Sequence, residues 1–257
     1  VHFYKNNAIY LASPGPCIHF FCKTTINVIN MIIGSGIQFY GSLESTNTYA
    51  SQCLKATELQ EGTVICTDFQ TAGKGHQGNR WESEEGKNLL FSIILYPSSV
   101  SLDNQFFISM AISLGIYDFL HVLLPEVKIK WPNDIYVKND KIAGILIENS
   151  VIGETIENCI AGIGININQE KFSRDIPNPV SLKMITGKES DTRTCLKEAL
   201  NYLDIRYKQL LYGNRGLIRD EYVSLLYRAG EWHTYRAEGN VFKGMIKGIS
   251  ENGSLKI

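Results

Sequence analysis

Residues 127–148 constrain the fold of this chain most, because they hold three short apolar segments separated by two turn sequences. Pro132-Asn133-Asp134 forms the first turn sequence and Asn139-Asp140 the second. Short strands joined in this way are typical of β-hairpins. The stretch therefore predicts three strands, at 127–131, 135–137 and 142–148, that follow one another through tight turns.

Strands and helices follow one another along the rest of the chain. The apolar patterns predict strands at 32–40, 63–69, 88–96 and 157–168. They predict helices from Ser45 or Thr46 to Leu59 and at 103–124, 192–212 and 216–227. The helix at 103–124 carries a wide apolar face, so we expect it to pack against the core.

The two ends of the chain differ in pattern from its middle. From Glu231 the sequence changes to short strands with turns, so we expect a small β domain at 231–257 after a main domain at 31–230. The last strand stops at Ile257, and we expect the chain to lack its natural end. Residues 1–30 hold an apolar segment broken by Pro14-Gly15-Pro16. We predict that they are an extension outside the fold rather than a membrane span or signal peptide.

Charge and cysteine content argue against several classes of function. Charged residues make up 20% of the chain, the formal net charge is -1, and no long run of Lys or Arg occurs. These features predict no nucleic-acid partner and no membrane partner. The 6 cysteines and 5 histidines are scattered, without a Cys-x-x-Cys pair. This spacing indicates reduced thiols in a cytoplasmic protein and no locally encoded metal site.

The loop Gly73-Lys74-Gly75-His76-Gln77-Gly78 is rich in glycine. It matches a dinucleotide fingerprint only formally, because no helix opens directly after it, and it lacks the Lys-Ser/Thr of a nucleotide phosphate loop. Its glycines would let backbone N–H groups approach an anion, with Lys74 and Arg80 adding charge. Trp81 offers a flat surface for a base. Taken alone, such a sequence is more often an ordinary surface loop.

Several other short stretches have an ordinary structural explanation when each is taken alone. Lys130-Trp131-Pro132-Asn133-Asp134 indicates a hairpin turn, Lys141 a solvated turn lysine, and Ser45-Thr46-Asn47 a helix cap. Gly144 and Gly162-Ile163-Gly164-Ile165-Asn166 are different, because glycine weakens the apolar strands that contain it. This pattern favours close approach by a ligand or another backbone.

In this order along the chain, these stretches resemble the catalytic domain of biotin protein ligases. That family has Ser-Thr-Asn, Gln-x-Ala-Gly-Arg-Gly-x-x-Gly-x-x-Trp, Lys-Trp-Pro-Asn-Asp, Lys-x-Ala-Gly-Ile-Leu and Gly-x-Gly-x-Asn. The corresponding stretches here are 45–47, 70–81, 130–134, 141–146 and 162–166, and the resemblance covers about 32–230. It implies an α+β (mixed α/β) fold of the class II synthetase-like type, with a central mixed sheet flanked by helices and a small C-terminal β-barrel.

The resemblance also implies a role for each matching residue. Biotin would be bound by Ser45, Thr46, Asn47, Gln70, Gly73, Lys74, Gly75, His76, Lys141 and Gly144. The nucleotide and the adenylate would be bound by Gly78, Arg80, Trp81, Asn133, Asp134 and Asn166. Lys141 and Lys74 would be the catalytic residues, with Lys141 between the biotin carboxylate and the α-phosphate.

The implied activity is the ATP-dependent formation of biotinyl-5′-AMP and the transfer of biotin to a lysine. The acceptor would be the biotin carboxyl carrier domain of acetyl-CoA carboxylase or a related carboxylase, and Mg²⁺ would accompany ATP. Two anions meet in the first step, so a positioned ammonium and backbone donors would stabilise its transition state. Position 74 is Lys where the family usually has Arg, and His76 and Gln77 replace frequent arginines. We therefore expect weaker retention of the adenylate.

Two alternatives stay open at this point. A lipoate or octanoate ligase or transferase would share the fold and the catalytic lysine, and the choice of substrate depends on the shape of the pocket. A non-enzymatic biotin sensor that represses transcription would need an N-terminal helix-turn-helix, and the residues before Met31 are too few and not basic. A homodimer is compatible with the sequence.

Overall fold

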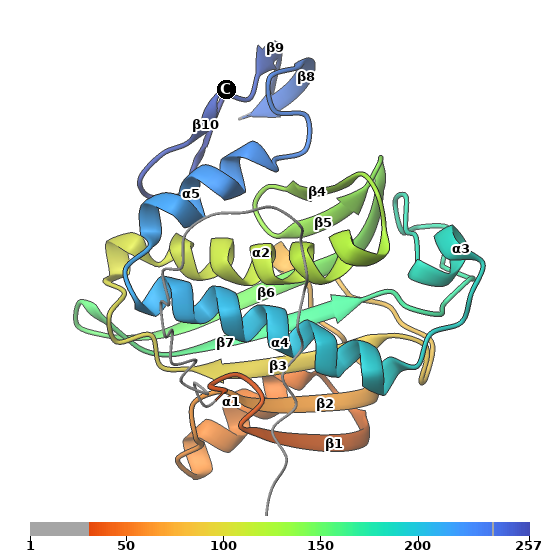
Figure 1. Ribbon diagram of the computed structural model, residues 1–257, viewed down its shortest axis with the longest axis vertical. Helices are drawn as coiled ribbons and strands as arrows, with labels where there is room; N and C mark the ends of the chain where they lie inside the picture. The colour runs from red at the N-terminus through yellow and green to blue at the C-terminus, as the bar shows by residue number, and fades with distance from the viewer. Residues whose placement is uncertain (1–30, 238) are drawn as a thin grey trace, which may run out of the picture. The chain divides into compact units, whose positions relative to one another are not determined.

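The computed structural model of the protein describes residues 31–237 and 239–257. The predicted extension, residues 1–30, lies outside the described residues. The described part is built on a seven-stranded sheet with the strand order β1-β2-β3-β7-β6-β5-β4 (Figure 1). The strands are β1 (Gly36–Leu43), β2 (Thr63–Gln70), β3 (Leu89–Leu95), β4 (Val127–Lys130), β5 (Asp134–Val137), β6 (Asp140–Ile152) and β7 (Thr155–Ile165).

The sheet is mixed, as the resemblance implied. Strands β1 and β2 run parallel, and every other neighbouring pair runs antiparallel. The parallel pair is possible because helix α1 (Thr46–Ala56) crosses over between its two strands. Strands β4, β5 and β6 form the succession of hairpins that the turn sequences predicted. The fold class is therefore confirmed.

Helices cover both faces of the sheet. Helix α1 packs against β2, β3 and β7 on one face, where Ala50, Ile65, Ile94 and Ile160 form a small buried cluster. Helices α2 (Phe106–Leu123) and α4 (Thr192–Leu211) cover the opposite face and pack against each other. The larger core lies between these two helices and the sheet. Because both faces are covered, β3 is buried along its whole length.

Helix α2 is the central helix of the larger core. The helical segment Leu102–Leu123, which includes α2, is long and apolar enough to cross a membrane, and an 18-residue window of it has a mean hydropathy of 1.7. Within the domain, 67% of that window is buried, including Met110, Leu114 and Leu120. The wide apolar face predicted from the sequence therefore packs against the sheet, α4 and α5 (Arg215–Ser224).

The C-terminal segment forms two small sheets. Strand β8 (Trp232–Ala237) pairs with β9 (Asn240–Met245), and β10 (Gly248–Ile249) pairs with β11 (Leu255–Lys256). Short β structure was predicted here, and these sheets are separate two-stranded pairs rather than a closed barrel. Trp131 Nε1 donates a hydrogen bond to the Gly253 carbonyl at 2.8 Å and so attaches this segment to the predicted site region.

The structure differs from the sequence prediction at a few elements. Helix α3 (Leu182–Thr186) was missed, because a helix of five residues is too short to show a periodic apolar face. The Ser181 side chain caps it by accepting from the Met184 N–H, and Gly187 ends it in the left-handed region at φ 71°. Helix α1 ends at Ala56 rather than Leu59, and β1 begins at Gly36 rather than Ile32.

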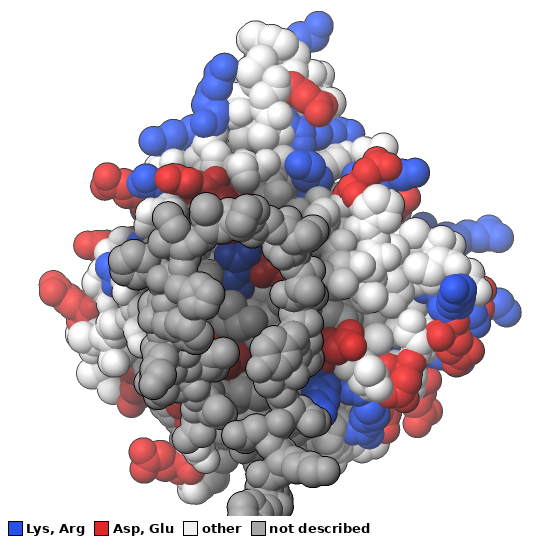
Figure 2. Space-filling view, in the orientation of Figure 1, with Lys and Arg blue, Asp and Glu red and all other residues white. Residues whose placement is uncertain are grey.

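Charges of both signs are interspersed over the described part of the visible face (Figure 2). This distribution agrees with the formal net charge of -1. Cys53, Cys66, Cys159 and Cys195 carry free thiols, and burial raises the pKa of Cys66 and of Cys159 to about 12. These buried thiols are therefore un-ionised at neutral pH.

Candidate active site

Two adjoining cavities lie where the N-terminus of α1, the end of β2 and the strands β5, β6 and β7 come together. The smaller cavity has a volume of about 280 Å³ and the larger about 410 Å³. Both are lined by Asn79, Arg80, Trp81, Lys130, Asp134 and Lys141. Their combined volume suits a ligand with two parts, and the shared residues mark the junction between those parts.

The smaller cavity has a hydrogen-bonded polar wall. Gln70 Oε1 accepts from the Thr46 backbone N–H at 2.8 Å and from its hydroxyl at 3.2 Å. Ser92, which is fully buried in the apolar strand β3, lies 2.7 Å from Thr46 Oγ1 and 2.6 Å from Asn47 Oδ1. The single Ser92 proton can be donated to Asn47 Oδ1 or to Thr46 Oγ1, and the Thr46 hydroxyl donates in turn to Gln70. The Gln70 NH₂ group donates to no other described residue, so its N–H groups can bind a ligand.

The start of helix α1 places these side chains in the cavity. Ser45 occupies the N-cap position, but its side chain makes no capping hydrogen bond. The simple explanation of Ser45-Thr46-Asn47 as a helix cap is therefore insufficient. Asn47 Nδ2 donates to Glu148 at 2.7 Å, and Asn47 packs so tightly on Gly162 that a Cβ there would lie 2.2 Å from its Oδ1. The Asn47 side chain therefore requires glycine at position 162 of β7.

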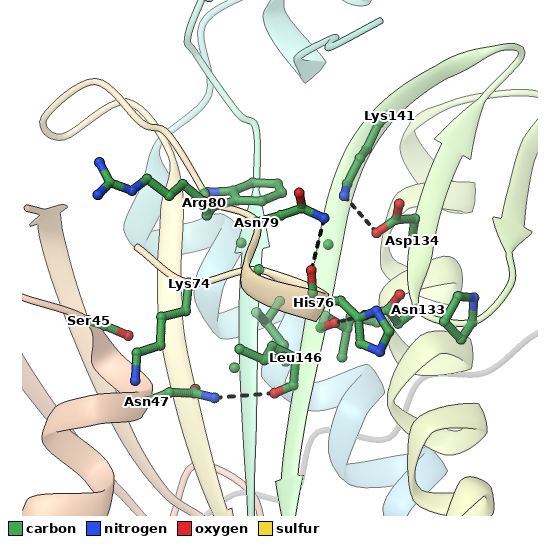
Figure 3. Close-up of a pocket in the computed structure, with 18 of the residues that line it drawn as sticks. Ser45, Asn47, Lys74, His76, Asn79, Arg80, Asn133, Asp134, Lys141 and Leu146 are labelled. Atoms are coloured by element: carbon green, nitrogen blue, oxygen red, sulfur yellow. Dashed lines mark hydrogen bonds and ion pairs between the residues drawn. The ribbon is translucent and has the colours of Figure 1, made fainter. Parts of the chain in front are cut away.

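Lys141 and Asp134 form an ion pair at the junction of the two cavities. Their Nζ and Oδ1 atoms are 2.7 Å apart, and the side chains are 30% and 24% exposed (Figure 3). Lys141 lies on β6 and Asp134 begins β5, next to the register shift between Ile135 and Tyr136. The ion pair fixes the ammonium in place without burying it completely. A ligand can therefore still reach Lys141.

Trp81 separates the two cavities and packs flat against the sheet. A Cβ on Gly164 would lie 2.4 Å from its Cε2 atom, and a Cβ on Gly144 would lie 2.8 Å from its Cζ3 atom. The close approach predicted at these glycines is therefore made by an indole ring, not by a backbone. Lys141 Nζ lies 5.5 Å from the centre of the Trp81 ring. The indole Nε1 is buried and has no hydrogen-bond partner among the described residues.

The glycine-rich loop folds as a tight hairpin over the smaller cavity. The Gly75 N–H donates to Asn79 and the Trp81 N–H to Gly73, and Lys74 and Arg80 form an isolated β-bridge. The Gly75 N–H is thus already used within the loop, so an anion would have to displace that bond to reach it. Figure 3 shows Lys74 extending toward Ser45 and Asn47, at the other end of the cavity from Lys141.

Comparison with known proteins identifies the kind of chain that carries this site. Residues 40–166 match the biotin/lipoate A/B protein ligase family. That range holds the two cavities except the segment 172–179. Residues 40–166 are therefore a domain of this family. The resemblance drawn from the five ordered motifs is therefore confirmed.

Relatives and solved structures agree with the family assignment. The chain is 28% identical over 83% of its length to the biotin–[acetyl-CoA-carboxylase] ligase of Paracoccus denitrificans, of which it covers 91%. It is 28% identical over 87% of its length to the bifunctional ligase/repressor BirA of Bacillus subtilis, of which it covers 70%. The biotin protein ligase of Aquifex aeolicus in complex with biotin and ATP superposes with a TM-score of 0.73 at 28% identity, covering 86% of this chain and 90% of that one.

The structure brings most of the family's motif residues to the cavities. The smaller cavity is lined by Ser45, Thr46, Asn47, Gln70, Lys74, Gly75, His76, Arg80, Trp81, Asn133, Asp134, Lys141 and Gly144. Asn166 lines the larger cavity, where its Nδ2 donates to Val180 and its Oδ1 has no partner among the described residues. Gly73 and Gly78 line neither cavity. A Cβ on Gly73 would lie 2.4 Å from the Trp81 carbonyl, so that glycine permits the hairpin.

Other residues of the site carried no signal in the sequence. Ser92 was missed because a lone serine in an apolar strand resembles an ordinary strand residue. The segment after β7 was missed because it has neither a motif nor a periodic pattern. It lines the larger cavity with Phe172, Asp175, Ile176, Pro177 and Pro179.

The site suits a Mg²⁺ ion that arrives with a nucleotide rather than a permanent metal centre. Among the described residues, no group of three or more His, Cys, Asp or Glu side chains could hold a metal. The larger cavity is lined by the carboxylates of Glu82, Asp134 and Asp175. Mg²⁺ commonly takes one or two carboxylates together with substrate phosphates and water. The residues present therefore fit such an ion.

Proposed function

We propose that this chain is a biotin protein ligase, which adenylates biotin with ATP and transfers it to a lysine of a biotin carboxyl carrier domain. The observation that carries the proposal is the pair of adjoining cavities that meet at Lys141 and Asp134. One cavity has a polar wall that suits a small head group, and the other has room for a nucleotide. A carboxylate and an α-phosphate would meet at their junction.

The polar wall favours biotin over the lipoate or octanoate of the alternative proposal. A cyclic urea offers two N–H donors and one carbonyl acceptor. The wall offers the NH₂ donors of Gln70, together with the hydroxyl of Ser45, which makes no capping hydrogen bond. A dithiolane or a methyl end would leave these buried polar groups without partners, which costs about 1–3 kcal/mol for each group.

The larger cavity would receive ATP. Its aromatic and proline side chains, among them Phe172 and Pro177, offer apolar surface for the base, and Asn166 offers polar atoms beside it. Asp134 is already paired with Lys141, so Glu82 and Asp175 are the carboxylates that could share a Mg²⁺ ion with the phosphates. That ion would neutralise phosphate charge.

Lys141 would act at the step in which two anions approach each other. Its ammonium would lie between the biotin carboxylate and the α-phosphate, where negative charge increases in the transition state. Asp134 holds the ammonium at the junction before substrates bind. The hairpin 72–80 would close over the mixed anhydride and exclude water, and Lys74 would add a second positive charge.

Pyrophosphate release from ATP tests the proposal most simply. Biotin, lipoate and octanoate are compared in parallel under the same conditions. We expect biotin alone to stimulate release, followed by biotin transfer to an added biotin carboxyl carrier domain. Stimulation by lipoate or octanoate and not by biotin would assign the chain to the alternative substrate class.

A further inference from the structure

Lys130 is a second lysine at the junction of the two cavities. It ends strand β4, and its side chain lines both the smaller and the larger cavity. In the hairpin of β4 and β5 it lies directly opposite Asp134. Oppositely charged residues in such cross-strand positions commonly pair with each other. Asp134 instead pairs with Lys141 at 2.7 Å.

Lys130 is held by a neutral partner. Its Nζ donates to the Tyr136 hydroxyl at 2.8 Å. Tyr136 is 5% exposed, and its ring packs on Tyr227 with centroids 5.3 Å apart. In the described part of the chain, no carboxylate lies within ion-pairing distance of the Lys130 ammonium. A phenol hydroxyl orders an ammonium without neutralising it, and two of its three N–H donors stay available.

The other cations of the site are placed differently. Lys141 forms an ion pair with Asp134, and Arg80 extends away from that ion pair in Figure 3. Lys74 extends toward Ser45 and Asn47. Lys130 is therefore a positioned, uncompensated cation that faces the larger cavity as well as the junction.

We propose that Lys130 is a further catalytic residue, which binds the pyrophosphate that leaves during adenylation. This inference rests on the proposed function of the site. In that step a carboxylate oxygen forms a bond to the α-phosphorus, and the bond from the α-phosphorus to the bridging oxygen breaks. The bonding electron pair leaves on pyrophosphate, and no proton is gained or lost. Charge on the departing oxygens is stabilised by a fixed ammonium.

The two half-reactions separate this role from that of Lys141. Pyrophosphate takes part in adenylation and in its reversal, but not in the transfer of biotin from the adenylate to the carrier. A group that contacts only the leaving pyrophosphate therefore affects the first half-reaction and not the second. A residue needed only for folding would affect both.

The experiment compares Lys130→Met with Lys128→Met in the full chain. Lys128 lies on the same strand and lines neither cavity, so Lys128→Met removes the same charge without changing the site. The first readout is biotin-dependent exchange of pyrophosphate into ATP, with KM for pyrophosphate and for ATP. The second is biotin transfer to a carrier domain from added biotinyl-AMP. We expect Lys130→Met to lose about a hundredfold in exchange, with higher KM values, and to lose far less in transfer. Lys130→Arg should recover part of the exchange.

Two results would overturn the inference. Exchange by Lys130→Met equal to that of Lys128→Met would mean that Lys130 does not contact the leaving group. Equal losses in exchange and in transfer would make Lys130 a structural residue. If the unmodified chain exchanges pyrophosphate with lipoate or octanoate and not with biotin, the proposed substrate fails, and the same comparison is made with that acid. If no acid supports exchange, both proposals fail.

Discussion

Gly164 is a position at which a single added methyl group should disturb the candidate site directly. A Cβ added there would lie 2.4 Å from Cε2 and 2.7 Å from Cζ2 of Trp81. Ordinary carbon–carbon contact is about 3.5 Å, so the indole would have to move by about 1 Å. The ring is rigid and packs against Gly144 as well, so it cannot yield by rotating a flexible end.

We expect Gly164→Ala to cost about 1–3 kcal/mol of unfolding free energy, which is typical of overpacking in a dense interior. For a domain of this size each kcal/mol lowers Tm by about 2–4 °C. Biotin-dependent pyrophosphate release should fall as well, because Trp81 lines both cavities at their junction.

Gly41→Ala is the matched control, since nothing lies within 4 Å of a Cβ at that strand position. Trp81→Phe in the Gly164→Ala background should restore part of Tm, because the smaller ring relieves the overlap, without restoring release. The reasoning would be refuted by a Gly164→Ala protein whose Tm and pyrophosphate release both match those of Gly41→Ala.

Three further predictions concern the wall, the loop and the core. Ser92→Ala should lower the free energy of unfolding by about 1–3 kcal/mol, because Asn47 Oδ1 loses a buried donor. It should also raise KM for biotin with little change in KM for ATP. A KM for biotin equal to that of the unmodified chain would exclude a positioning role for Ser92. The double variant Lys74→Arg/His76→Arg should retain biotinyl-AMP for longer in a filter-binding chase, because a guanidinium binds phosphate in a bidentate manner. Unchanged retention would contradict the expectation that the charge of this loop controls retention. Burial raises the pKa of Cys159 to about 12 from the ordinary 9.0, so the folded state favours the neutral thiol. The stabilisation is complete below about pH 9 and is lost as pH rises toward 12, so Cys159→Ala should weaken the alkaline fall in stability; equal slopes in denaturant titrations at pH 8 to 11 would argue against it.

The strand and helix pattern could be predicted because it depends on local sequence. The hairpins at 127–148 have turn residues at their ends, and helix α2 has an apolar face that fits one side of a sheet. The residues of the cavity could be named because their motifs come from a family resemblance. Neither argument required knowledge of the three-dimensional arrangement.

The partners of those residues could not be predicted, because they are brought together by tertiary packing. Asp134 pairs with Lys141 on β6 rather than with Lys130, which lies opposite it on β4. Ser92 on the buried strand β3 bonds to Thr46 and Asn47 of α1, and no periodicity in the sequence marks it. Gly144, Gly162 and Gly164 were explained only in general terms, since the Trp81 ring and the Asn47 side chain that require them lie far away in the sequence.

Biotin-dependent pyrophosphate exchange by Lys141→Ala tests the central claim most directly, which is that this ammonium acts where the acyl group and the nucleotide are joined. The account predicts a loss of at least about a hundredfold in exchange, with circular dichroism and Tm close to those of the unmodified chain. Exchange at a near-normal rate in a folded Lys141→Ala protein would contradict it.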